Sequence, residues 1–123
     1  MIGIGTAKEG RQKAAEGSVF VINVAEVELN PSAHLCCPVN DGDEQKPRFS
    51  IAVLDGLATI IQEKVNEGQE VFVHCEGGLW RSPLVVAWYY KRYGNMSLAQ
   101  AYEKVRKIRP NLKEVLDWMI VRP

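Results

Sequence analysis

The sequence has few cysteines, and they form no recognisable framework. Its 123 residues include 3 cysteines, of which Cys36 and Cys37 are adjacent. This pattern argues against a set of disulfides, and the paired spacing of a zinc site is absent. We therefore expect a reducing, cytoplasmic setting and neither a metal nor another cofactor. Each thiol then needs either a packing explanation or a catalytic one.

Long apolar runs and an excess of one charge are also absent. No stretch approaches the roughly 20 apolar residues of a membrane span. The first residues, MIGIGTAKEGRQK, carry charges too early for a signal peptide. Fifteen basic residues balance fifteen acidic ones, so no overall field attracts nucleic acid or a membrane surface. We expect a monomer that binds neither.

Strand and helix patterns alternate along the chain. Continuous apolar runs indicate buried strands, and leucine and isoleucine at three- and four-residue spacing indicate helices. The expected strands are residues 1–5, 19–24, 34–39 and 70–74, and the expected helices are residues 7–16, 47–67, 83–93, 98–108 and 112–120. This order predicts a single α/β domain over residues 1–123, with a short, mostly parallel central sheet flanked by helices.

The segment VFVHCEGGLWRSP, residues 71–83, carries the clearest chemical signal. A buried strand ends at Cys75, and Gly77 and Gly78 allow the following backbone amides to turn inward and bind an anion. A helix N-terminus near Ser82 adds unpaired N–H groups at the same place. Arg81 adds a planar, bidentate guanidinium suited to phosphate. The segment therefore predicts a phosphate site at the carboxyl edge of the sheet, with a thiol at its floor.

The same surroundings predict the roles of the neighbouring side chains. Helix N-termini and cations lower a cysteine pKa from ~8.5 to roughly 3.5–7.5, so Cys75 should be a thiolate. We expect His74 to orient the loop and Ser82 to donate to the sulfur. Cleavage of a phosphate ester also needs an acid, which the turn PVNDGDEQ supplies as Asp41 or Asp43. Asp41 lies nearer the strand end and is the better candidate.

The segment resembles a known signature. A His-Cys pair followed, after five residues, by Arg-Ser is similar to the loop of the cysteine-dependent protein tyrosine phosphatases, and most of all to the compact dual-specificity phosphatases. The resemblance covers most of the chain in that family's order: IGTAKEG near the start, VINVAE at 21–26, PVND at 38–41, VFVHCEGGLWRSPLVVAWYY at 71–90 and VRKIRP at 105–110.

The resemblance implies a protein phosphatase that forms a phosphocysteine intermediate without a metal. Its substrates would be phosphotyrosine, and also phosphoserine and phosphothreonine, in a phosphorylated protein or a small phosphoester. It implies Cys75 as nucleophile, Arg81 as phosphate clamp, Asp41 as general acid and Ser82 as thiolate partner. The implied phosphate-binding residues are Glu76, Gly77, Gly78, Leu79, Trp80 and Arg81, with His74 in support.

Other interpretations remain open at this stage. Taken alone, Cys75 would more often be a buried small apolar residue, and the glycines with Arg81 are what favour a nucleophile. A phosphate-binding module without turnover, a sulfurtransferase and a phosphatase of a non-protein phosphoester are the alternatives. Trp80 and Glu76 depart from the family pattern and suggest an unusual pocket rim. Cys36 and Cys37 are expected to pack in a strand, with an oxidative disulfide to Cys75 as a minority hypothesis.

Overall fold

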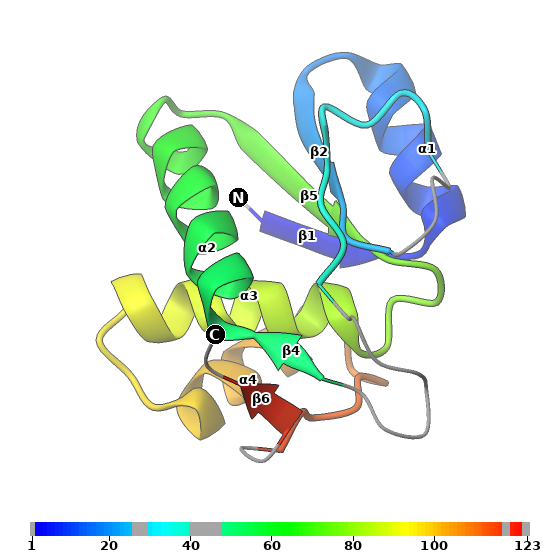
Figure 1. The fold of residues 1–123 in the computed structure, drawn as a ribbon. Helices are drawn as coiled ribbons and strands as arrows, with labels where there is room; N and C mark the ends of the chain where they lie inside the picture. The colour runs from blue at the N-terminus through cyan, green and yellow to red at the C-terminus, as the bar shows by residue number, and fades with distance from the viewer. Residues whose placement is uncertain (1, 26–29, 40–47, 117–118, 122–123) are drawn as a thin grey trace.

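The central sheet has four strands, all parallel, in the order β1-β5-β2-β3. The computed structural model describes residues 2–25, 30–39, 48–116 and 119–121 (Figure 1). The four strands are β1 Ile2–Gly5, β2 Val19–Asn23, β3 Leu35–Cys36 and β5 Glu70–His74. This arrangement confirms the predicted α/β fold with a short parallel sheet and places β5 between two neighbours.

The described residues form four helices, α1 Ala7–Glu16, α2 Ile51–Asn66, α3 Arg81–Tyr93 and α4 Leu98–Arg106, of which the first three contact the sheet. Helix α1 packs against β2 and β5, while α2 packs against α3 and α3 against α4 (Figure 1). Within the described ranges, no helix is long and apolar enough to cross a membrane.

Alternation along β5 explains why its sequence is apolar throughout. Val71 and Val73 belong to the large core that also contains residues of α2, α3 and α4. Phe72 points to the opposite face, where it packs with Val19 and Val21 of β2 against Ala14 of α1. Because helices cover both faces, every position of the strand is buried or partly buried. Cys75 therefore directly follows a strand that is packed on both faces.

The starts of α1 and α4 follow their capping residues, and two other starts are corrected. Helix α3 begins at Arg81, two residues before the expected start at Pro83, and its N-cap Trp80 makes no side-chain capping hydrogen bond. Ser97 and Gln100 form the predicted capping box of α4. The expected helix start at Pro47 lies outside the described residues, and α2 itself begins only at Ile51. Ser50 is its N-cap, with its Oγ accepting from the backbone of Val53, and a short strand β4, Phe49–Ser50, comes directly before it.

The predicted last helix, residues 112–120, is wrong. Residues 112–116 are not helical, and Ile120–Val121 form the strand β6, which pairs in parallel with β4 (Figure 1). The backbone donors of this segment have partners elsewhere: Lys113 N–H donates to Leu79 O, and Val115 N–H donates to the Tyr102 hydroxyl. Leu112, Val115, Met119 and Ile120 belong to or pack against the core without forming one face of a helix, whereas Leu116 is exposed.

Candidate active site

The signature loop, residues 75–81, connects the end of β5 to the first turn of α3. Gly78 has a φ of 72°, and a Cβ at this position would lie 2.9 Å from the carbonyl carbon and oxygen of Gly5. Only glycine satisfies both conditions without strain. The loop therefore folds tightly against the end of β1 and turns back over its own cysteine.

Cys75 is enclosed by hydrogen-bond donors. Its side chain is buried, and its Sγ lies 3.3 Å from the Ser82 Oγ and 3.2 Å from the Gly78 backbone nitrogen. Burial alone raises the pKa of the Cys75 thiol. The Ser82 hydroxyl, the backbone N–H groups of Ser82 and Gly78, and the charge of Arg81 lower it and prevail. The pKa of Cys75 is thus lowered, in the direction that the sequence predicts.

His74 holds the backbone at Cys75. It is fully buried, with Nδ1 3.1 Å from Cys75 O and Nε2 3.3 Å from the side-chain nitrogen of Asn30. Because an amide NH₂ only donates, Nε2 accepts and Nδ1 carries the proton that is donated to Cys75 O. Burial is the main cause that lowers the pKa of His74, so the ring is neutral. Gly10 of α1 packs directly on this ring, where a Cβ would lie 2.2 Å from it.

The remaining loop residues differ in exposure. Glu76 and Gly77 are exposed, whereas Leu79, Trp80 and Arg81 are partly buried. Trp80 packs against the hydrophobic core, and the Lys113 Nζ lies 5.5 Å from the centroid of its ring. The bulky side chain that departs from the family pattern is therefore anchored by the segment that follows α4.

Both candidate acids, Asp41 and Asp43, lie outside the described residues. The strand that precedes them, β3, is parallel to β2, which also pairs with β5. The chain thus leaves β3 at the same edge of the sheet as the signature loop. The structure tests neither acid, and the choice of Asp41 stays a prediction.

Three residues that support the loop were not recognised in the sequence. Besides Asn30 at His74, these are Ala7, whose N–H donates to Glu76 O at 3.1 Å, and Arg109, whose Nη2 donates to Gly77 O at 3.3 Å. Each of these residues is far from the loop along the chain, and the sequence around it gives no indication that it contacts the loop. Ala7 lies at the start of α1, and Arg109 lies in the segment VRKIRP. Both positions fall in regions that the family resemblance covers.

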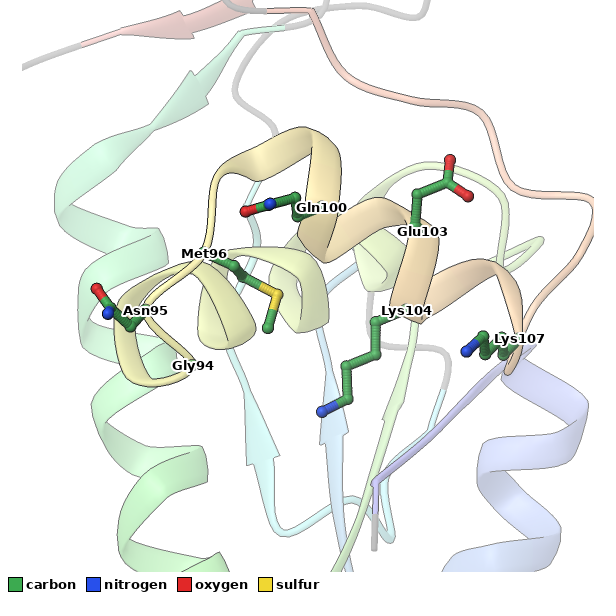
Figure 2. A pocket seen from close by; sticks show the side chains of 7 residues that line it. All are labelled: Gly94, Asn95, Met96, Gln100, Glu103, Lys104 and Lys107. Carbon is green, nitrogen blue, oxygen red and sulfur yellow. The ribbon is translucent and has the colours of Figure 1, made fainter.

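A separate hollow lies at the turn between α3 and α4. It has a volume of about 720 Å³ and includes no residue of the signature loop. Figure 2 shows its labelled side chains, of which Glu103 and Lys104 point to opposite sides of α4. It is lined by Gly94, Asn95, Met96, Gln100, Glu103, Lys104 and Lys107. Among the residues that the structure describes, no group of three His, Cys, Asp or Glu side chains is arranged to hold a metal ion.

Comparison with known proteins agrees with this geometry. Residues 5–120 match the family described as the dual specificity phosphatase, catalytic domain. Phosphatidylglycerophosphate phosphatase PTPMT2 of Arabidopsis thaliana is 30% identical over 111 residues, which cover 82% of this chain and 46% of that protein. Human dual specificity phosphatase 28 is 29% identical over 103 residues, which cover 80% of this chain and 57% of that protein. The chain therefore spans only about half the length of these curated relatives.

Solved structures share the fold. The crystal structure of human DUSP28 superposes with a TM-score of 0.71 at 23% identity, covering 91% of this chain and 81% of that one. A mouse putative dual specificity phosphatase complexed with zinc tungstate gives a TM-score of 0.75 at 23% identity, covering 94% and 75%. With the match over residues 5–120, the chain belongs to the dual specificity phosphatase catalytic domain family of cysteine-dependent phosphatases.

Proposed function

We propose that this domain hydrolyses phosphate monoesters through a phosphocysteine intermediate. The observation that carries the proposal is the Cys75 thiol, whose pKa is lowered by the Ser82 hydroxyl and the Gly78 amide despite its burial. A buried thiol without these donors would be protonated and inert. Membership of the family supports the same chemistry.

In the first step, the Cys75 thiolate attacks phosphorus opposite the leaving oxygen. The sulfur–phosphorus bond forms as the phosphorus–oxygen bond breaks, and Asp41 transfers its proton to the departing oxygen. Arg81 and the loop amides hold the three equatorial oxygens, where negative charge is concentrated in the transition state. No step in this sequence requires a metal.

In the second step, water attacks the phosphocysteine. Asp41, now a carboxylate, accepts a proton from this water, and the sulfur–phosphorus bond breaks to release inorganic phosphate. The departing thiolate carries a negative charge, which the Ser82 hydroxyl stabilises by donating to the sulfur at the 3.3 Å separation. The enzyme returns to its starting state with the thiolate restored.

For the substrate we propose phosphotyrosine in proteins, with phosphoserine and phosphothreonine as further substrates. A protein substrate is supported by the names of two other relatives, human dual specificity protein phosphatase 12 and the tyrosine-protein phosphatase MSG5 of Saccharomyces cerevisiae. A phospholipid monoester is the second candidate, because the Arabidopsis relative is named a phosphatidylglycerophosphate phosphatase and matches 82% of this chain. Both substrates present the same phosphate group to Cys75, so they differ only in what surrounds it.

One assay tests the reaction class. The native domain should hydrolyse p-nitrophenyl phosphate, vanadate should inhibit it, and a chelator should leave the rate unchanged. Phosphate binding without turnover would instead indicate a binding module. Formation of a persulfide on Cys75 from thiosulfate would indicate a sulfurtransferase.

A second assay separates the substrates. Rates on phosphotyrosine, phosphoserine and phosphothreonine peptides are compared with the rate on phosphatidylglycerophosphate in detergent micelles. A kcat/KM at least about tenfold higher on the lipid than on every peptide would replace the protein substrate by the phospholipid.

The general acid is tested with a matched pair of variants, Asp41→Asn and Asp43→Asn. Removal of the true acid should slow hydrolysis by roughly 10²–10⁴-fold. The loss should be smaller for an aryl phosphate with a good leaving group than for an alkyl phosphate. If Asp43→Asn shows the loss and Asp41→Asn does not, the assignment moves to Asp43.

A further inference from the structure

The carbonyl groups of the signature loop are held from outside the loop. Glu76 O accepts from the Ala7 N–H at 3.1 Å, and Leu79 O accepts from the Lys113 N–H at 2.8 Å. Both of these donors belong to the backbone. Between them, Gly77 O accepts from a side chain, the Nη2 of Arg109, at 3.3 Å.

The peptide unit between Gly77 and Gly78 links this contact to the nucleophile. Its carbonyl oxygen accepts from Arg109, while its N–H, on Gly78, donates to the Cys75 Sγ at 3.2 Å. The described residues contain no cis peptide bond, so the C=O and N–H of this planar unit point in opposite directions. Fixing the oxygen therefore also fixes the direction of the N–H that lowers the pKa of Cys75.

Gly78 packs closely on Gly5, but the Gly77 side of this peptide unit has little to hold it in place by itself. It lies between two glycines, whose backbones have wide conformational freedom, and a Cβ at Gly77 would meet no atom within 4 Å. A charged donor on its carbonyl both restrains rotation of the unit and polarises its N–H.

Arg109 is itself held in place by the start of α1. Its Nη1 lies 3.5 Å from the Oε1 of Glu9, and the same oxygen accepts from the Thr6 N–H in the capping box of α1. The hydrogen bond from the Thr6 backbone is the largest cause that lowers the pKa of Glu9, with the charge of Arg109 contributing, so the carboxylate is ionised at neutral pH. The Nε of Arg109 is buried and has no hydrogen-bond partner in the described part of the chain. A partly buried guanidinium with an unpaired N–H is costly, which favours a role in function over one in stability.

We propose that Arg109 is a positioning residue that locks the Gly77–Gly78 peptide unit with its N–H toward Cys75. Arg109 thereby maintains the thiolate and the inward orientation of the loop amides without touching the substrate. Its effect on turnover rests on the proposed phosphatase function, whereas its effects on the thiol and on anion binding do not.

The test compares Arg109→Gln and Arg109→Lys with a matched control, Arg106→Gln. Arg106 is close in sequence, but its ion pairs are with Glu103 and Glu114. Three quantities are measured: the pH midpoint of Cys75 alkylation by iodoacetamide, followed by peptide mapping; the affinity for vanadate and inorganic phosphate by calorimetry; and kcat and KM for p-nitrophenyl phosphate.

Arg109→Gln should move the alkylation midpoint to higher pH and weaken vanadate binding about 10-fold. It should lower kcat/KM by about 10- to 100-fold, the scale of one hydrogen bond to a charged group. Arg109→Lys should fall between Arg109→Gln and the native protein, since an ammonium can still donate to Gly77 O. Arg106→Gln should match the native protein in all three measurements.

An unchanged alkylation midpoint and anion affinity in Arg109→Gln would overturn the proposal, even if the melting temperature falls. If Arg109→Gln fails to fold, the variant Glu9→Gln tests the positioning role in its place. This variant keeps an oxygen for the capping box but weakens the hold on Arg109, so a smaller shift in the same direction is expected, and no shift overturns the proposal. If the native protein turns over no phosphoester while Arg109→Gln still moves the midpoint, the proposed function fails and the positioning role stands.

Discussion

Cys75 follows β5 and Cys37 follows β3, so both thiols lie at the carboxyl edge of the same parallel sheet. Burial raises the pKa of both. For Cys37 burial is the only cause, and its pKa stays above the ordinary value. For Cys75 the donors of Ser82 and Gly78 and the charge of Arg81 outweigh burial. Position at this edge of the sheet is therefore not enough to lower the pKa of a thiol, because the signature loop and the start of α3 supply the donors that lower it.

Exchanging each thiol for a hydroxyl gives the sharpest contrast. Cys75→Ser should reduce turnover of an aryl phosphate by about 10⁴-fold or more while retaining vanadate binding. Cys37→Ser should leave kcat/KM within about twofold of the native value, because burial is the cause of its pKa shift and Cys37 belongs to no part of the signature loop. Steady-state kinetics and calorimetry check both variants, and full activity in Cys75→Ser would end the phosphatase proposal.

The geometry of the loop is the next point to test. Gly78→Ala would place a Cβ 2.9 Å from Gly5 at a φ of 72°. Such strain should cost about 1–3 kcal/mol in the free energy of unfolding, measured by urea denaturation, and should displace the amide that faces the sulfur. Gly56→Ala in α2, where a Cβ meets nothing within 4 Å, is the control and should be neutral or stabilising.

Removing the Ser82 hydroxyl should make Cys75 more like Cys37. This hydroxyl is the largest of the causes that lower the pKa of Cys75, so Ser82→Ala should raise that pKa. The acidic limb of the kcat/KM profile then moves to higher pH, because less thiolate is present at any given pH below the new pKa. We expect a loss of roughly tenfold at pH 6 and a smaller loss at pH 8. A profile that keeps its native shape would show that Ser82 does not act on the thiolate.

The two thiols should also affect stability in opposite ways as pH changes. The folded pKa of Cys75 lies below its unfolded value, so its contribution is present above the unfolded pKa and is lost as pH falls toward the folded pKa. The folded pKa of Cys37 lies above its unfolded value, so its contribution is present below the unfolded pKa and is lost as pH rises through the folded pKa.

Urea denaturation between about pH 6 and pH 10 resolves these slopes. In the native protein, the titration of Cys75 makes the free energy of unfolding rise with pH, and that of Cys37 makes it fall. Cys75→Ser should therefore remove the rise, and Cys37→Ser should remove the fall. The effect should be the smallest of those described, because each variant removes a single titration. Identical slopes in the two variants would contradict the opposite pKa shifts.

The loop that encloses Cys75 could be predicted from sequence because its signal is local. Cys75, Gly78, Arg81 and Ser82 follow one another within one strand–loop–helix, so the residue types and their spacing define the geometry directly. The parallel sheet was equally predictable, since the apolar runs of β2 and β5 have no polar face.

The supports of the loop could not be predicted in this way. Asn30 reaches His74 across 44 residues, and Arg109 reaches Gly77 across 32, and no periodicity encodes such contacts. The incorrect helix at 112–120 has a related cause. The backbone of Lys113 donates to Leu79 O, so a tertiary hydrogen bond replaces the helical one that the apolar spacing suggested.

The supports of the signature loop come from both ends of the described chain, with Glu9 and Arg109 separated by 100 residues. Proteins are synthesised from the N-terminus, so Cys75 leaves the ribosome well before Arg109 and Lys113 do. A nascent chain that ends between these points has the cysteine and the loop but lacks two of the donors that orient the loop carbonyls. The orientation that we propose for the Gly77–Gly78 peptide unit would therefore be completed only after residue 109 has been synthesised, later than the Ser82 and Gly78 donors that lower the pKa of Cys75.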